Sequence, residues 1–302
     1  MRRVTLAALA CLLLAGAVPA AAEPITFRQL LERPRAEASH RIAYGAEPLQ
    51  FADLWLPEGA GPHPVVVMVH GGCWQARLPG VELMAYIAED LRRAGVAAWN
   101  VEYRRLGGAG GGYPGTFQDV ARGIDHLRAV AAQHRLDLSR VALTGHSAGG
   151  HLALWAAARH RLPAASPLRS GEPLPVRGVV TLAGINDLKS YRADGPQACG
   201  GPATIDGITG AAARAGADVY ADTSPPAMLP LGVRQVVVSG VLDHIVPARF
   251  GRDYGAAARA AGDPAAVIDI EGTGHFELID PTSAAWTRIR AELLGLLGPA
   301  RP

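Results

Sequence analysis

Short apolar runs alternate with amphipathic stretches from residue 40 to the end of the chain. Eight of the runs are predicted as strands: 41–44, 49–56, 64–70, 96–103, 140–145, 177–182, 235–240 and 266–270. Several of them, such as 65–69 and 236–238, are continuous apolar segments made mostly of β-branched residues. That pattern is typical of strands that are buried on both faces of a parallel sheet.

Five amphipathic stretches separate or follow the later strands, and we predict helices over 80–94, 116–134, 148–160, 247–261 and 281–297. In the second stretch, Val120, Ile124 and Leu127 recur at three- and four-residue spacing, which gives one apolar stripe. Alternating strands and helices predict right-handed crossovers and a doubly wound, mostly parallel α/β sheet. Residues 187–230 interrupt the alternation and are rich in Gly, Ala and Pro, so we interpret them as a small cap-like insertion over the strand ends.

The composition suits one globular domain over residues 23–302. The chain has 302 residues, 49% of them hydrophobic and 19% charged, a size that single α/β domains reach. The net charge is only +2 and no basic stripe occurs, which disfavours nucleic acid and acidic membrane surfaces as partners. The glycines of 107–112 lack G-x-G-x-x-G spacing, and no metal-ligand motif is present, so we predict no cofactor and no metal.

Residues 1–22 have the layout of a cleaved signal peptide. Arg2 and Arg3 precede the apolar run 4–18, and Ala20 to Ala22 supply a small-residue cleavage site. The run is shorter than the ~20 residues of a spanning helix, so we expect an exported protein, periplasmic or secreted, without stable membrane insertion. The mature chain keeps Cys73 and Cys199, which form either a permitted disulfide or two separate buried thiols.

Residues Gly145 to Gly149 read G-x-S-x-G, centred on Ser147. The motif follows a predicted strand and opens a predicted helix, which is the setting of a nucleophile elbow. Small residues must flank the serine because a side chain there would collide with the neighbouring elements. At a helix N-terminus, Ser147 would also lie where the positive end of the helix dipole favours a developing oxyanion.

A serine nucleophile needs a base and an acid, and both are expected on loops after later strands. Asp243 follows the strand that ends at residue 240, and His275 follows the strand that ends near residue 270. Because the carboxyl ends of parallel strands meet at one edge, Ser147, Asp243 and His275 can converge there. Asp187 is the alternative acid, and His244 is the weaker alternative base.

Three further histidines lie close to these motifs. We interpret His70, His146 and His151 as supporting or solvated residues, and we expect the ring of His146 to point away from the serine hydroxyl.

The segment 70–74, His-Gly-Gly-Cys-Trp, follows a predicted strand directly. Backbone amides of Gly71, Gly72 and Cys73, together with that of Ala148, could bind the carbonyl oxygen of a substrate as an oxyanion hole. The alternative is an ordinary glycine turn at a strand end. Four elements in the expected order, each after a predicted strand, favour the oxyanion hole.

The motifs HGGCW, GHSAGGHLALW, VLDHIVP and GTGHFELI together resemble the α/β-hydrolase superfamily, and more narrowly its HGGxW/GxSAGG esterase and kynurenine-formamidase-like branch. The resemblance covers nearly all of 40–298 and implies about eight strands, the triad of Ser147, Asp243 and His275, and the oxyanion hole named above. One departure is Cys73, which stands where lipase-type relatives carry a third glycine. Its amide can donate only if the turn accepts a side chain.

We therefore predict a serine hydrolase that cleaves short-chain or small carboxylic esters through an acyl-enzyme on Ser147. The enzymatic alternative is an amide-type hydrolase, acting on arylformamides or small peptides. A non-catalytic binding protein on the same scaffold is the remote alternative, although such proteins tend to lose a triad residue. The scattered apolar residues of 187–230 predict no lipid-docking lid, and hence a small, water-soluble ester or amide as substrate.

Overall fold

The computed structural model describes residues 23–298 and folds them around one eight-stranded sheet. The predicted signal peptide 1–22 lies outside the described residues. The strands are β1 (His40–Ala43), β2 (Phe51–Trp55), β3 (His63–Val69), β4 (Ala97–Val101), β5 (Leu136–His146), β6 (Gly178–Leu182), β7 (Arg234–Gly240) and β8 (Ala265–Ile270). Their order is β1-β2-β4-β3-β5-β6-β7-β8. The pairs β1–β2 and β2–β4 are antiparallel and all the others are parallel, so the predicted α/β-hydrolase fold is confirmed.

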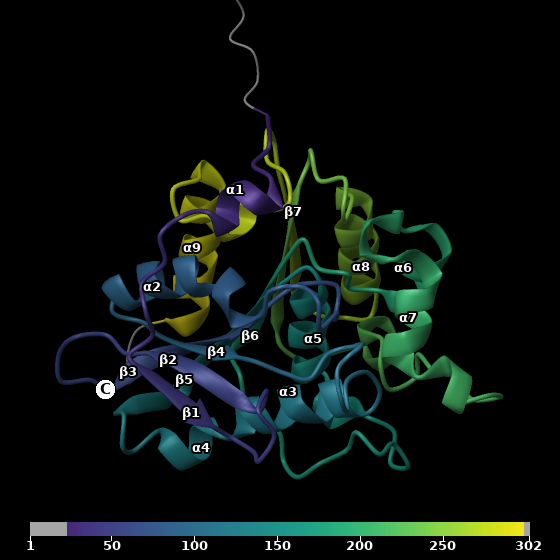
Figure 1. Cartoon of the computed structure of the whole chain (residues 1–302), viewed down its shortest axis with the longest axis horizontal. Helices are drawn as coiled ribbons and strands as arrows, with labels where there is room; N and C mark the ends of the chain where they lie inside the picture. The colour runs from purple at the N-terminus through teal and green to yellow at the C-terminus, as the bar shows by residue number, and fades with distance from the viewer. Residues whose placement is uncertain (1–22, 299–302) are drawn as a thin grey trace, which may run out of the picture.

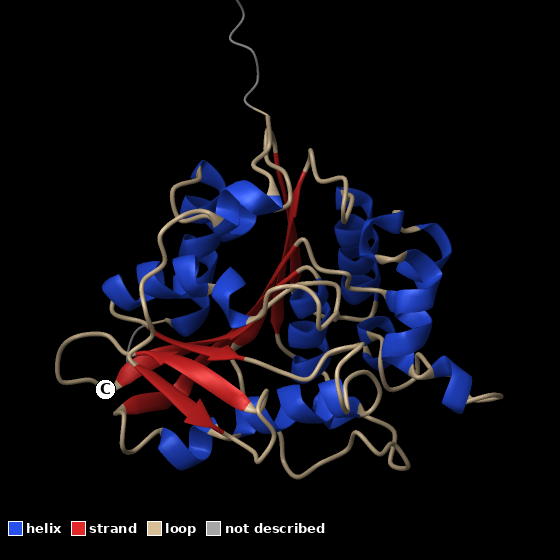
Figure 2. Cartoon of the chain, in the orientation of Figure 1, coloured by secondary structure: helices blue, strands red, loops and turns tan. Residues whose placement is uncertain are grey.

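Helices cover both faces of the twisted sheet (Figures 1 and 2). They are α1 (Phe27–Leu31), α2 (Ala85–Arg93), α3 (Gly115–Asp125), α4 (Leu127–Val130), α5 (Ala148–Ala157), α6 (Leu188–Asp194), α7 (Gly201–Thr209), α8 (Ala248–Ala260) and α9 (Ala284–Leu297). Helices α2 and α9 pack on one face, and α3, α5 and α8 pack on the other. Two-sided coverage explains why the central strands are continuously apolar.

The core is centred on β3, where the side chains from Val65 to Val69 are all fully buried. Complete burial of each such side chain stabilises the fold by roughly 1.5–3 kcal/mol. The carboxyl ends of β3, β5 and β7 therefore lie in the well-packed part of the molecule. The loops that follow these strands are therefore anchored to buried, well-packed residues.

Two predicted helices differ from those observed. The stretch 116–134 breaks at His126 into α3 and α4. At the break the indole of Trp99 donates a 2.8 Å hydrogen bond to the carbonyl of Gly123, and a side chain that enters the helical ladder in this way interrupts it. The stretch 148–160 ends at Ala157 and continues as a 3-10 turn.

The insertion 187–230 contains α6 and α7, which lie side by side beyond α8 (right in Figure 1). Its helices are joined by the ion pair between Arg192 and Asp206, 2.6 Å apart. A second ion pair, between Arg214 and Asp222, holds the end of the segment. Within residues 23–298, no helix has the length and apolarity needed to span a bilayer.

Candidate active site

Ser147 stands in the tight turn between β5 and α5. Its backbone has φ 56° and ψ −120°, a positive-φ conformation that costs a non-glycine residue roughly 1–3 kcal/mol. The turn is so close that a Cβ on Gly149 would come within 2.0 Å of the carbonyl oxygen of Val69, and one on Gly145 within 2.1 Å of the carbonyl oxygen of Gly149. Glycine at both positions is therefore required, as the sequence predicts for a nucleophile elbow.

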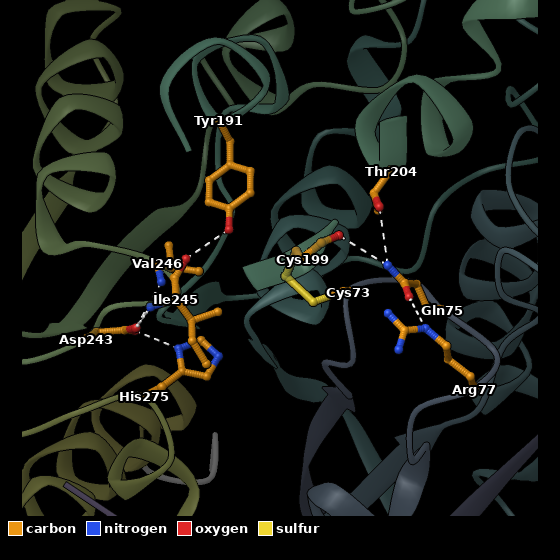
Figure 3. Close-up of a disulfide and its surroundings, with 10 residues drawn as sticks. All are labelled: Cys73, Gln75, Arg77, Tyr191, Cys199, Thr204, Asp243, Ile245, Val246 and His275. Atoms are coloured by element: carbon orange, nitrogen blue, oxygen red, sulfur yellow. Dashed lines mark hydrogen bonds and ion pairs between the residues drawn. A yellow bond between two sulfur atoms is a disulfide. The ribbon is translucent and has the colours of Figure 1, made fainter. Parts of the chain in front are cut away.

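Asp243 and His275 come together on the adjacent loops that follow β7 and β8 (Figure 3). The Nδ1 atom of His275 lies 2.6 Å from Oδ2 of Asp243. The other carboxylate oxygen, Oδ1, accepts hydrogen bonds from the amides of Ile245 (2.7 Å) and Val246 (2.9 Å). Both oxygens are thus engaged, which fixes the carboxylate and directs the Nδ1 proton of His275 toward it. The Nε2 atom of His275 makes no hydrogen bond within residues 23–298.

His146 connects the elbow to His275. Its ring centroid lies 4.4 Å from that of His275, and its Nε2–H donates a 3.0 Å hydrogen bond to the carbonyl oxygen of His275. Burial, followed by the proximity of His275, lowers the pKa of His146 well below its ordinary value, so the ring is neutral. The ring is thus directed toward His275. No hydrogen bond joins the Ser147 hydroxyl to His275 in the described part of the chain, and such contacts are often loose without a substrate.

The alternative acid and bases lie elsewhere. Asp187 caps the N-terminus of α6, where its carboxylate accepts from the amides of Lys189 and Ser190. His244 is exposed. His151 is buried, donates from Nε2 to the carbonyl oxygen of Thr223, and has a pKa lowered by burial to about 4. None of the three is brought to the Asp243–His275 pair.

The segment 70–74, which we call the oxyanion loop, lies against the serine. A Cβ on Gly71 would be 3.2 Å from the Cβ of Ser147. Positive φ angles at Gly72 (97°), Cys73 (51°) and Trp74 (55°) make the turn, so the position of Cys73 accepts a side chain in a conformation that favours glycine. The amides of Gly71, Gly72 and Cys73 donate no hydrogen bond to any described residue. As the first residue of α5, Ala148 also has an amide without an intrahelical acceptor.

A disulfide between Cys73 and Cys199, with Cα atoms 5.3 Å apart, ties the oxyanion loop to the insertion (Figure 3). Beside it, the side-chain amide of Gln75 donates hydrogen bonds to the carbonyl oxygen of Cys199 (3.1 Å) and to the hydroxyl of Thr204 (3.2 Å). Of the two states that the sequence left open for these cysteines, the structure contains the disulfide. It braces the side of the site opposite the Asp243–His275 pair.

The insertion also reaches the acid loop. The hydroxyl of Tyr191 on α6 donates a 2.8 Å hydrogen bond to the carbonyl oxygen of Ile245 (Figure 3). Burial, and secondarily the charge of Asp243, raises the pKa of Tyr191 to about 12, so its hydroxyl remains a donor at neutral pH. The insertion therefore contacts both the oxyanion loop and the loop that carries Asp243.

The BD-FAE family model matches residues 52–253, which is two thirds of the chain and includes the elbow, the oxyanion loop and Asp243. The chain belongs to the BD-FAE family. Its membership confirms the resemblance to an esterase branch of the α/β-hydrolases.

Among curated proteins, this BD-FAE chain is similar to Esterase LipC of Mycobacterium tuberculosis, with 25% identity over 250 residues, which are 80% of this chain and 60% of LipC. It is also similar to the probable carboxylic ester hydrolase LipM of the same organism, with 26% identity over 80% of this chain and 56% of LipM. The chain thus spans little more than half the length of these relatives.

Solved structures with the same fold include a truncated form of a carbohydrate esterase from gut microbiota, at 20% identity, with a TM-score of 0.71 and coverage of 87% of this chain and 97% of that one. An inhibited esterase B from Lactobacillus rhamnosis has a TM-score of 0.75 at 19% identity, over 89% of this chain and 90% of that one. At these identities the likeness concerns the fold alone.

Sequence reasoning missed Glu102, which lies behind the oxyanion loop of this BD-FAE chain as the partner of His70. Glu102 follows β4, is 3% exposed, and lies 2.9 Å from Nε2 of His70. A signal was available, because β3 and β4 are adjacent parallel strands and a polar residue follows each of them at the same sheet edge. Among residues 23–298, no group of three or more His, Cys, Asp or Glu side chains is arranged to hold a metal ion.

Proposed function

We propose that this protein is a serine hydrolase that cleaves small carboxylic esters through an acyl-enzyme on Ser147. The observation that carries the proposal is the Asp243–His275 pair, 2.6 Å apart, beside an elbow whose serine has the strained φ of 56°. Membership of the BD-FAE family and similarity to LipC and LipM support an ester as the substrate.

In the proposed reaction the Ser147 oxygen attacks the ester carbonyl while Nε2 of His275 takes its proton. Asp243 holds His275 in the tautomer whose Nδ1 carries the other proton and stabilises the imidazolium that forms. The developing oxyanion is bound by amides of the oxyanion loop and of Ala148. His275 then protonates the leaving alcohol, and the same base activates water to release the acid.

The substrate we propose is small and water-soluble. The large apolar side chains of the insertion point inward: Leu188, Ile205 and Ile208 are fully buried. Among the described residues, the large hydrophobic side chains that are exposed are Val241 and Leu294, both outside the insertion. A lid that docks on lipid needs a contiguous apolar face, and this one offers none.

The test combines fluorophosphonate labelling with a series of p-nitrophenyl esters. We expect the wild-type protein to be labelled and the folded Ser147→Ala variant to be unlabelled, with kcat lowered at least 10³-fold, as is usual when a triad serine is removed. We expect kcat/KM to be highest from acetyl to hexanoyl and to fall by dodecanoyl. A Ser147→Ala variant with near-normal turnover would refute the nucleophile, and a rate that jumps above the substrate's solubility limit would refute the substrate class.

We also propose that the protein is exported. The layout of residues 1–22 supports a signal peptide, and a disulfide such as Cys73–Cys199 persists in oxidising compartments. Fractionation of the producing cells, with N-terminal sequencing of the mature protein, tests this. We expect a chain that begins at Glu23 outside the cytoplasm.

A further inference from the structure

A second histidine, His70, lies buried directly behind the oxyanion loop. It is 0% exposed, and its ring stacks on that of Tyr103 with centroids 4.3 Å apart. Its Nε2 atom lies 2.9 Å from Oε1 of Glu102, and its Nδ1 atom lies 2.8 Å from the carbonyl oxygen of Gly71. Ionised carboxylates and carbonyl oxygens only accept hydrogen bonds. Each ring nitrogen therefore faces an acceptor, and the contact with the Gly71 carbonyl is a hydrogen bond donated by Nδ1–H.

Glu102 is itself held as a carboxylate. Its Oε1 atom accepts a 2.9 Å hydrogen bond from the amide of Tyr103, and its Oε2 atom accepts one from the amide of Val81. The guanidinium of Arg105 lies 3.4 Å away. Burial by itself raises the pKa of Glu102, but the charge and hydrogen bond of His70, together with Arg105, outweigh that effect and lower it to about 2. The acceptor for Nε2 of His70 is thus permanent at neutral pH.

Two hydrogen bonds, one from the His70 ring to the Gly71 carbonyl and one from Tyr103 to the His70 carbonyl, determine where the loop amides point. The cis peptide bonds of residues 23–298 all precede prolines, so the bonds on either side of Gly71 are trans, with C=O and N–H pointing in opposite directions. Nδ1 of His70 draws the Gly71 carbonyl toward its ring and thereby turns the Gly72 N–H away from it. The hydroxyl of Tyr103, 2.8 Å from the carbonyl oxygen of His70, does the same for the Gly71 N–H.

We propose that His70 is a positioning residue for the oxyanion hole: its Nδ1–H fixes the Gly71–Gly72 peptide so that the Gly72 amide faces the substrate's carbonyl oxygen, and Glu102 holds the ring in that role. This inference rests on the proposed function. His70 does not touch substrate, because both of its nitrogens are occupied. Its effect is to keep a donor preorganised for charge that appears in the transition state.

The closing experiment compares two variants whose side chains have the same number of non-hydrogen atoms and the same branching, His70→Asn and His70→Leu. Asparagine retains an N–H near the position of Nδ1 and can still bond the Gly71 carbonyl, whereas leucine has no donor. We expect His70→Leu to lower kcat about 10²-fold, the lower bound for losing one oxyanion donor, with KM nearly unchanged. We expect His70→Asn to recover most of that loss. The inhibition constant of a trifluoromethyl ketone, whose serine adduct carries an oxyanion, should weaken in proportion to kcat/KM.

Equal losses in both variants, or a loss confined to KM, would overturn the positioning role. Thermal melts identify variants that do not fold. If neither His70 variant folds, Glu102→Gln decides the matter, because it weakens the contact that holds the His70 ring against the Gly71 carbonyl. A normal kcat and a normal affinity for the ketone in that variant would then count against the proposal.

Measurements on the wild-type protein and on Ser147→Ala distinguish a failure of the proposed function from a failure of the inference about His70. A wild type that neither hydrolyses p-nitrophenyl acetate nor binds the ketone refutes the proposed function itself. An active wild type beside a fully active His70→Leu variant refutes only the inference about His70.

Discussion

Two buried histidine–carboxylate pairs lie at the carboxyl edge of the sheet, one on either side of the elbow. On the β7–β8 side, His275 bonds Asp243 at 2.6 Å. On the β3–β4 side, His70 bonds Glu102 at 2.9 Å. The pairs are alike in chemistry and in burial, yet they are connected differently. His275 has one nitrogen without a partner in the described part of the chain, whereas His70 has none.

This difference teaches that a carboxylate partner does not by itself mark a general base. A base must have a nitrogen that can receive the nucleophile's proton, and in His70 that nitrogen is used to hold a peptide group. The carboxylates differ less. Each carboxylate accepts hydrogen bonds from two backbone amides, and Glu102 in addition lies 3.4 Å from the cation of Arg105. In the proposed mechanism the Asp243–His275 pair transfers protons, whereas the His70–Glu102 pair holds the oxyanion loop.

The largest expected effect separates the two histidines directly. His275→Ala should lower kcat for p-nitrophenyl acetate by about 10⁴–10⁶-fold, because His275 is the base that takes the serine proton in the proposed mechanism. The loss in His70→Leu should be at least a hundred times smaller on the same scale. Initial rates, with melting curves to verify folding, provide the comparison. Losses of equal size would abolish the distinction.

The next effect concerns the acids. Asp243→Asn should lower kcat by about 10³–10⁴-fold, because an amide favours the wrong tautomer of His275. Asp187→Asn is the matched control, since asparagine caps a helix as well as aspartate does and α6 should be undisturbed. Steady-state kinetics of both variants measure the ranking. The reverse ranking would move the acid to the loop after β6.

The same acid-to-amide change at the other pair should act mainly on stability. Glu102→Gln should cost less kcat than the roughly 10²-fold of a whole lost oxyanion donor. The pKa of Glu102 is lowered from 4.5 to about 2, so its contribution to folding is complete above pH 4.5 and is lost as the pH falls toward 2. We expect up to about 3 kcal/mol of acid-sensitive stability.

Urea unfolding at pH 7, 4 and 2.5 measures that contribution. The free energy of unfolding should decline more steeply with acid in the wild type than in Glu102→Gln. Parallel declines would show that the buried carboxylate is not held ionised by its neighbours.

The smallest effect on turnover concerns the disulfide, which braces only the His70 side. Thiol counting on denatured, unreduced mature protein should find no free cysteine. Replacing Cys73 and Cys199 by serine should lower the free energy of unfolding, by up to about 5 kcal/mol in the chain-entropy description. We expect kcat to fall by less than about tenfold, since His70 still orients the loop. Two free thiols in the wild type would show that the Cys73–Cys199 disulfide does not form.

The sequence predicted the sheet and the elbow well because both leave local signals. Every predicted strand is present within a few residues, since continuous β-branched runs such as that of β3 occur where both faces are buried. Gly145 and Gly149 stand where backbone atoms approach within about 2 Å of a Cβ. Helices α6 and α7 were not predicted, because a segment rich in glycine and alanine has no apolar stripe.

The second pair was beyond local signals. His70 and Glu102 are 32 residues apart, and only the adjacency of β3 and β4 makes them partners. We interpreted His70 as a supporting residue, which agrees with its place behind the loop. What could not be inferred was the direction of the support: a proton at Nδ1 that acts on one carbonyl group, which depends on a contact of 2.8 Å.

The Cys73–Cys199 bridge also divides the chain into an enclosed part and a free part. Strands β4, β5 and β6, together with Ser147, lie within the covalent ring. Asp243 and His275 lie outside it, on the loops after β7 and after the partly exposed edge strand β8. Partial opening of a protein begins where burial is least. Ser147 and the oxyanion loop would then stay assembled while His275, the proposed base, separates from them. Mild denaturant should therefore abolish activity before Trp99 of the enclosed strand β4 reports any unfolding.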